Sequence, residues 1–234
     1  MHETGVISRF AQSDEDVMRC QALRHRSFRK CEGIDSDAFD ALSQHVMIEE
    51  AGVLVGTLRL RVLPDLADLN ATYTGGFYAI SGLAGPSLEI GRFCVVPDAT
   101  VPHVLREAWA VLTRVVDTED IQFIFGCASF EGTDPVRYAD AFALLLARHQ
   151  GNLRIGVKAI ETKRLCDVIN PHLNPTAAGN QLPALLRSYL AMGGFVSDHL
   201  VIDRELGTLH VFTAVEIAKI PPARARALRR AALN

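Results

Sequence analysis

Three charged residues stand inside otherwise apolar segments of this 234-residue chain. Arg59 lies in VLVGTLRL, and Glu89 and Arg92 lie in SLEIGRFCVV. Charges are seldom buried in strands unless they are paired or take part in chemistry. A carboxylate in such a place can act as a general base, and an arginine can bind a carboxylate or a phosphate through two parallel hydrogen bonds. The structural alternative is an ordinary cross-strand ion pair between Arg59 and Glu89.

Other chemistries lack a motif in this chain. It contains no G-x-G-x-x-G, no G-x-x-x-x-G-K-[ST] and no G-x-S-x-G, so dinucleotide, P-loop and serine-hydrolase functions have no support. The eight histidines show no zinc-ligand spacing, and we expect no metal site. The net charge of −3 is too balanced to predict binding to nucleic acid.

Composition predicts a soluble or peripheral globular protein. Apolar residues make up 49% of the chain and the mean hydropathy is +0.15, yet the longest uncharged run, residues 69–88, carries glycines and a proline. That run does not fit a spanning helix. We see no signal peptide, and the five cysteines are odd in number without a C-x-x-C pair. We therefore expect reduced thiols and a cytoplasmic location.

Hydrophobic periodicity and capping signals predict a mixed α/β order. The expected strands are 4–10, 42–50, 53–63, 87–96, 121–128, 195–202 and 209–217. The expected helices are 13–29, 102–116, 134–148, 182–192 and 221–233. This order favours one α/β domain over residues 1–234, with a mixed central sheet flanked by helices and with insertions at about 64–86 and 150–181.

Seven motifs, in order, carry a resemblance to a known family. R-H-R-S-F (24–28), D-A-F-D (37–40), V-G-T-L-R-L (55–60) and L-E-I-G-R-F-C-V (88–95) resemble the autoinducer-synthase-like branch of the GNAT acyltransferases. Within that branch, I-F-G-C-A-S-F-E-G-T-D-P (124–135), L-P-A-L-L-R-S-Y-L-A-M-G (182–193) and D-R-E-L-G-T-L-H-V-F-T-A-V-E-I (203–217) resemble the bacterial L-ornithine Nα-acyltransferases. The resemblance extends over about residues 5–230.

The resemblance implies a GNAT-like fold and a specific reaction. A (3-hydroxy)fatty acyl group passes from acyl carrier protein to the α-amine of L-ornithine and gives lyso-ornithine lipid. The 4'-phosphopantetheine arrives on the carrier, so no tightly bound cofactor is implied. The alternatives are an acyl-homoserine-lactone synthase, which uses acyl carrier protein and S-adenosylmethionine, and a non-catalytic acyl- or lipid-binding module. The tryptophan that such synthases carry after R-x-x-x-F is missing here, since the only tryptophan is Trp109.

The donor site departs from the usual GNAT pattern. The basic, glycine-rich pyrophosphate loop is replaced by P-D-A-T-V-P-H-V at residues 97–104. Without a glycine the backbone cannot approach a pyrophosphate closely, so we expect acyl carrier protein rather than coenzyme A as donor.

The resemblance also implies residue roles. Glu89 is the expected base, and Tyr138 is a general acid for the leaving thiolate, unless it is only a packing aromatic. Arg59 or Arg92 would bind the ornithine carboxylate and Asp37 or Asp40 its side-chain amine, although these positions also form an internal ion-pair network in related synthases.

The acyl-donor residues follow from the same resemblance. Arg24 and Phe28 would shape the donor entrance. Backbone N–H groups would hold the thioester oxygen at four consecutive residues: Phe93, Cys94, Val95 and Val96.

Basic clusters suggest the expected partners. Those that could receive an acidic carrier protein are Arg26, Arg29 and Lys30, and a second group of Arg148, Arg154, Lys158, Lys163 and Arg164. The run R-A-R-A-L-R-R (224–230) suits peripheral contact with the inner membrane. Each cluster can equally be a solvated helix face.

Overall fold

The computed structural model describes residues 5–65, 67–97, 99–170, 172 and 174–233. The chain forms two compact units, each built from separate segments. The first unit comprises residues 1–62, 88–121 and 222–234, and the second comprises residues 63–87 and 122–221.

The first unit holds four strands in the order β1-β2-β3-β5: β1 Val6–Phe10, β2 Gln44–Glu50, β3 Val53–Leu63 and β5 Ser87–Val95. β1 pairs antiparallel with β2, and β2 pairs antiparallel with β3 as the predicted hairpin. The turn between β2 and β3 uses Ala51 and Gly52 at φ 50° and 79°, the left-handed conformation that tight hairpin turns need.

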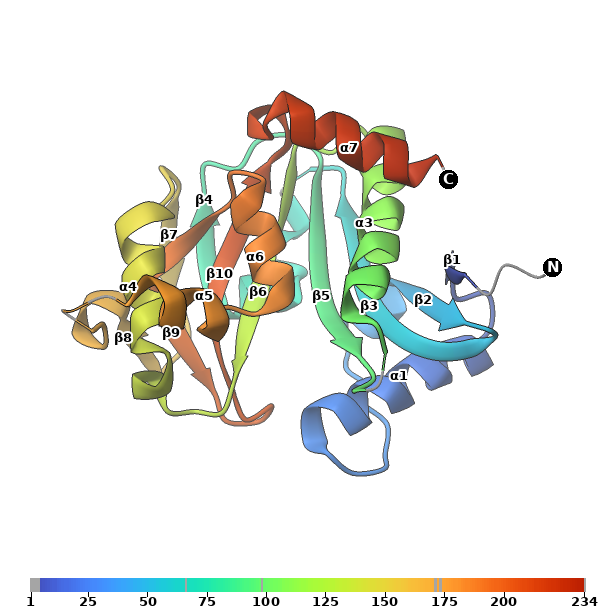
Figure 1. Cartoon of the computed structure of the whole chain (residues 1–234), viewed down its shortest axis with the longest axis horizontal. Helices are drawn as coiled ribbons and strands as arrows, with labels where there is room; N and C mark the ends of the chain where they lie inside the picture. The colour runs from blue at the N-terminus through green and yellow to red at the C-terminus, as the bar shows by residue number, and fades with distance from the viewer. Residues whose placement is uncertain (1–4, 66, 98, 171, 173, 234) are drawn as a thin grey trace. The chain divides into compact units, whose positions relative to one another are not determined.

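Three helices belong to this unit: α1 Asp14–Arg29, α3 Val101–Thr118 and α7 Pro222–Ala232. Ser13 caps α1 as predicted, since its side chain accepts a hydrogen bond from Asp16 N. Helix α7 packs on α3 (Figure 1). Arg229 pairs with Asp117 of α3 at 2.8 Å, and Arg114 donates a hydrogen bond to Ala232 O near the end of α7.

The second unit holds strands in the order β6-β10-β9-β8: β6 Phe123–Glu131, β10 Thr208–Glu216, β9 Phe195–Asp203 and β8 Thr162–Arg164. All three pairings between these neighbours are antiparallel. A separate antiparallel pair joins β4 Tyr78–Ser81 to β7 Arg154–Val157. A buried cluster that includes Tyr78, Phe125 and Phe212 brings β4 together with the larger sheet.

The helices of the second unit are α2 Tyr73–Phe77, α4 Ala139–Arg148, α5 Pro175–Gln181 and α6 Ala184–Ala191. Short 3-10 helices lie at Asp40–Leu42 in the first unit and at Ala67–Ala71, Pro135–Tyr138, Leu165–Asp167 and Ile217–Lys219 in the second. Among the residues with described coordinates, no helix has the length and apolar character to cross a membrane.

The predicted elements are present, with two differences. The segments 64–86 and 150–181 were expected to be loop and helix, but they also contribute strands β4, β7 and β8. These strands are three or four residues long, too short for alternation to be visible, and β4 and β7 find each other only through tertiary structure. The expected helix 134–148 begins as the 3-10 turn Pro135–Tyr138. Thr4, the first residue of the first predicted strand, lies outside the described residues.

Candidate active site

Five of the predicted site residues of the first unit meet, together with Asp35, in a closed ring of ion pairs, which we call the arginine–aspartate network. Each of three arginines contacts two aspartates, and each aspartate contacts two arginines. In order around the ring the members are Arg24, Asp35, Arg92, Asp37, Arg59 and Asp40, with N–O distances between 2.5 and 3.1 Å.

Arg24 of α1 is the most deeply buried member, with no exposed surface. Its guanidinium donates to both carboxylate oxygens of Asp40 at 2.7 and 3.0 Å and to the carbonyl of Asp35. The His45 ring lies 3.3 Å away, and Gln21 adds a hydrogen bond of 2.9 Å to Asp40. Burial and the neighbouring Arg24 lower the pKa of His45, so this imidazole is neutral at pH 7.

Arg59 and Arg92 complete the ring from β3 and β5. Arg59 donates to Asp37 and Asp40 and lies 5.7 Å from the Phe39 ring centroid. Arg92 donates to Asp35 and Asp37, and its guanidinium lies 6.0 Å from the ring centroid of Phe28. Phe28 therefore packs beside the network.

The charges of the network balance internally. Burial by itself would raise the pKa of Asp40, but hydrogen bonds from Arg24 and Arg59 outweigh it and hold that pKa below its usual range. All four residues predicted to bind ornithine, namely Asp37, Asp40, Arg59 and Arg92, thus bind one another in this structure. The arrangement matches the internal-network alternative, and their substrate roles stay predictions.

Glu89 lies on β5 with 6% of its surface exposed. Three residues further along the strand, Arg92 adopts φ 54°, a left-handed conformation that side chains other than glycine rarely take. The positive φ falls on Arg92 and not on the preceding Gly91. This conformation accompanies the contacts of Arg92 with Asp35 and Asp37.

The four predicted oxyanion residues differ in what their N–H groups do. The Val96 N–H donates to Val55 O of β3 at 2.9 Å, so it is already used. Phe93, Cys94 and Val95 lie at the end of β5, and Val96 directly follows it. Burial raises the pKa of Cys94 to about 12, so its thiol is no nucleophile at neutral pH.

Tyr138 lies in the second unit, at the end of the 3-10 turn Pro135–Tyr138. Its hydroxyl donates to Glu131 O at 2.7 Å, and its ring packs 5.0 Å from that of Phe130. Burial raises its pKa. These contacts fit the packing alternative, and the general-acid role stays a prediction.

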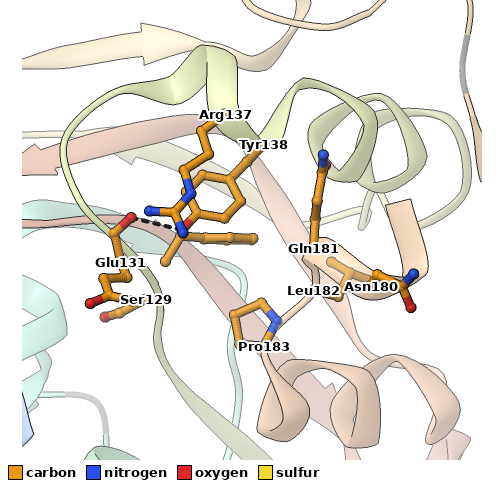
Figure 2. A pocket seen from close by; sticks show the side chains of 9 residues that line it. Ser129, Glu131, Arg137, Tyr138, Asn180, Gln181, Leu182 and Pro183 are labelled. Carbon is orange, nitrogen blue, oxygen red and sulfur yellow. Dashed lines mark hydrogen bonds between the residues drawn. The ribbon is translucent and has the colours of Figure 1, made fainter. Parts of the chain in front are cut away.

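Tyr138 also borders a pocket of about 450 Å³ in the second unit (Figure 2). Arg137 lies over the Tyr138 ring at 5.4 Å. The other pocket residues are Ser129, Phe130, Glu131, Asn180, Gln181, Leu182 and Pro183. The side chains of Ser129 and Glu131 extend together, away from Asn180 and Gln181 (Figure 2).

Sequence reasoning missed Asp35, His45 and Gln21. Asp35 stands two residues before Asp37 in the run D-S-D-A-F-D, and a count of carboxylates near the D-A-F-D motif would have found it. Gln21 and His45 carried no such signal, because their contact with the network depends on how α1 packs on β2.

Within the described residues there is no group of three or more histidine, cysteine or acidic side chains that could hold a metal ion.

Residues 19–110 match the family model "Acetyltransferase (GNAT) domain". The architecture is therefore the GNAT acyltransferase fold, and the chain is an acyltransferase. The chain is also similar to a solved CoA-dependent acyl-homoserine lactone synthase, with a TM-score of 0.51 and 12% identity over 97% of this chain and 88% of that one.

The predicted resemblance to the ornithine acyltransferases is confirmed. The chain is 27% identical to the L-ornithine Nα-acyltransferase of Rhodobacter capsulatus, over 89% of this chain and 88% of that protein. It is 29% identical to that of Rhizobium meliloti, over 91% of this chain and 80% of the relative.

Proposed function

We propose that the protein transfers a (3-hydroxy)fatty acyl group from acyl carrier protein to the α-amine of L-ornithine and releases lyso-ornithine lipid. One observation carries the proposal. Four curated relatives, 24–29% identical over about 90% of this chain, are all named L-ornithine Nα-acyltransferase.

The reaction needs a base, because an α-amine is mostly protonated at neutral pH and only the neutral amine attacks a thioester. Glu89 supports this step, since it is a buried carboxylate on β5 close to the strand's irregular residue, Arg92. It would accept the ammonium proton directly or through a water molecule. The amine nitrogen then forms a bond to the thioester carbonyl carbon, the C–S bond breaks and the pantetheine thiolate leaves, while the second proton lost by the nitrogen passes to solvent.

Developing negative charge on the carbonyl oxygen needs backbone donors. Phe93, Cys94 and Val95 are our candidates, because the N–H of the fourth predicted residue, Val96, already donates to Val55 O. The leaving thiolate needs a proton, and Tyr138 is the proposed donor. Its raised pKa keeps the hydroxyl protonated at neutral pH.

The start of α3 supports acyl carrier protein as the donor. A pyrophosphate at a helix N-terminus is held by the free N–H groups of the first turn. Here Pro102 has no N–H, and the N–H groups of His103 and Val104 both donate to Thr100 O. Such a turn offers little to the pyrophosphate of coenzyme A, whereas the pantetheine of a carrier protein carries a single phosphate.

Charged surfaces support the proposed partners. Arg26 and Arg29 lie in the last turn of α1, and Arg26 pairs with the exposed Glu32 at 3.6 Å. In the second predicted group, Lys158 donates to Asn70 Oδ1 and Gly75 O, so it is already engaged. We therefore place carrier docking at the end of α1. The exposed arginines of α7 remain our proposed contact with an anionic membrane surface.

The test is incubation of the purified protein with 3-hydroxyacyl carrier protein and a panel of amino acids, followed by mass spectrometry of the products. We expect N-acyl-ornithine, and little product when the matching acyl-CoA replaces the carrier. Acylation of S-adenosylmethionine would instead identify a lactone synthase. Absence of any N-acyl amino acid from folded protein would overturn the proposal.

A further inference from the structure

A row of polar residues crosses three strands of the second unit. Thr208 of β10 stands opposite Glu131 of β6 on one side and opposite Asp203 of β9 on the other. Residues opposite each other in antiparallel strands share a face of the sheet, with Cβ atoms about 5 Å apart. His210 lies two residues after Thr208 and so shares this face. We call Glu131, Thr208, Asp203 and His210 the acceptor row.

Two buried atoms of the acceptor row have no hydrogen-bond partner among the described residues. They are Thr208 Oγ1 and His210 Nε2, and their residues are only 9% and 1% exposed. Buried polar atoms are nearly always satisfied, and leaving one unpaired is unfavourable. Two such atoms at next-but-one positions of one strand therefore point to a partner outside the chain, either a bound water or a ligand.

That partner must be a hydrogen-bond donor. Tyr78 donates its hydroxyl hydrogen to His210 O at 3.0 Å. We assign to His210 the tautomer that fits this bond, in which Nδ1–H donates to the Tyr78 oxygen at 3.1 Å. Nε2 then carries the lone pair. Burial lowers the pKa of His210 to about 4, so the ring is neutral at pH 7 and Nε2 is an acceptor.

The rest of the acceptor row favours positive charge. Asp203 is 7% exposed and contributes a carboxylate that receives one hydrogen bond from Tyr73 and one from Leu206 N. Glu131 is exposed and opens the row to solvent. Helix α2 covers the row, since Tyr73 holds Asp203 and the Phe77 ring lies 4.9 Å from that of His210. Aromatic rings also attract cations.

We propose that the acceptor row binds the side-chain ammonium of the amino acid that is acylated. A primary ammonium has three N–H donors and one positive charge. The acceptor row offers it two neutral acceptors, Thr208 Oγ1 and His210 Nε2, and beside them the carboxylates of Asp203 and Glu131. This inference rests on the proposed function and gives that reaction its selectivity for a basic acceptor. It also supplies the acidic partners that the arginine–aspartate network does not offer, because Asp37 and Asp40 are already bound to arginines.

The test compares L-ornithine with L-norvaline, which has the same skeleton but lacks the side-chain amine. We expect the wild type to prefer ornithine strongly in kcat/KM. The variants Asp203→Asn and Thr208→Val should each lose about 10- to 100-fold in kcat/KM for ornithine, the range for a hydrogen bond to a charged group. Their kcat/KM for norvaline should stay within a few-fold of the wild type. Asp68→Asn, which removes an exposed carboxylate from the same unit, is the matched control.

The outcomes separate this inference from the proposed function. If the variants keep the wild-type preference for ornithine, or lose both substrates equally, the acceptor row holds only a structural water and the inference is overturned. A wild type that acylates norvaline as well as ornithine overturns it too, while the N-acyltransferase function survives. If the wild type acylates no amino acid, the proposed function fails. In that case binding can still be measured by thermal melting. A rise in the melting temperature of the wild type with ornithine but not with norvaline, and no such rise for Asp203→Asn, would support ammonium binding by the acceptor row.

Discussion

The arginine–aspartate network and the acceptor row are both buried and polar, but they differ in whether their polar groups have partners within the protein. In the network every carboxylate contacts two arginines and every arginine contacts two carboxylates. In the acceptor row, Thr208 Oγ1 and His210 Nε2 have no partner among the described residues. A cluster whose charges are all paired stabilises the fold, whereas a cluster with unmatched acceptors next to carboxylates offers a place to a cation. Residue type alone would have placed substrate in the network.

The largest effect should come from breaking the network. Arg24→Met should lower the free energy of unfolding by about 3–5 kcal/mol, because it leaves Asp35 and Asp40 buried without one arginine each. Urea denaturation measures this loss. Arg26→Met removes a neighbouring arginine whose partner, Glu32, is 83% exposed in its side chain, and should change stability by less than about 1 kcal/mol. Equal losses in the two variants would contradict the structural role of the network.

Glu89 belongs neither to the arginine–aspartate network nor to the acceptor row. Its substitution therefore tests catalysis independently of both clusters. Glu89→Ala should lower kcat about 100-fold or more, the effect of losing a general base, with little change in KM for ornithine. Steady-state kinetics and a denaturation curve on the same preparation check this. The exposed Glu119→Gln is the control. Turnover within a few-fold of the wild type would show that Glu89 is not the base, and a large loss of stability would indicate a structural ion pair.

Acid should weaken the acceptor row through His210. The pKa of His210 is about 4 in the folded protein and about 6.5 when unfolded. The unfolded chain therefore binds the extra proton first, and stability falls as the pH drops from about 6.5 towards 4. Between pH 7 and pH 5, His210 should account for a loss of about 2 kcal/mol.

Chemical denaturation of the wild type and of His210→Asn at both pH values isolates this contribution. The variant should lose less stability between pH 7 and pH 5, although His45, whose pKa is also lowered, acts in both proteins. Asp40 contributes no change in stability between pH 7 and pH 5. Its pKa is lowered in the folded protein, so the stability that it contributes is lost only when the pH falls to the unfolded value of about 3.9 and below. An identical pH dependence in the two proteins would contradict the burial of a neutral imidazole.

The smallest effect on stability should come from Thr208→Val, which replaces an unpartnered buried hydroxyl by a methyl group. We expect unchanged stability or a gain of about 1 kcal/mol, since an unsatisfied polar atom is removed. Thermal melting without amino acid measures it. A loss above about 1 kcal/mol would mean that the hydroxyl has a structural partner, such as a bound water, and would remove the contrast with Arg24.

Local signals in the sequence predicted most elements of the fold. Ser13 and Asp134 cap the turns that follow them, and the hairpin of β2 and β3 follows the alternation of its residues. The charged residues within apolar runs were also found. Their partners were only partly predictable, because the network depends on α1, the loop after it, β3 and β5 meeting in space.

The acceptor row could not be predicted in this way. Thr208, His210 and Asp203 all stand in the quoted motif at 203–217, but nothing in the motif tells which of them lack partners. That property depends on the register of three antiparallel strands and on the hydrogen bond from Tyr78, which lies 132 residues away from His210 in the sequence. Non-local register is the information that a single sequence does not display.

The interleaving of the two units has a consequence for how the protein is made. The first unit uses α7, at residues 222–232, whereas the second unit ends at residue 221. On the ribosome the second unit is therefore fully synthesised before the first unit receives its last helix. Helix α3 must wait for α7 with its packing surface uncovered. Removal of α7 by truncation should then impair the first unit while leaving the second unit's core intact.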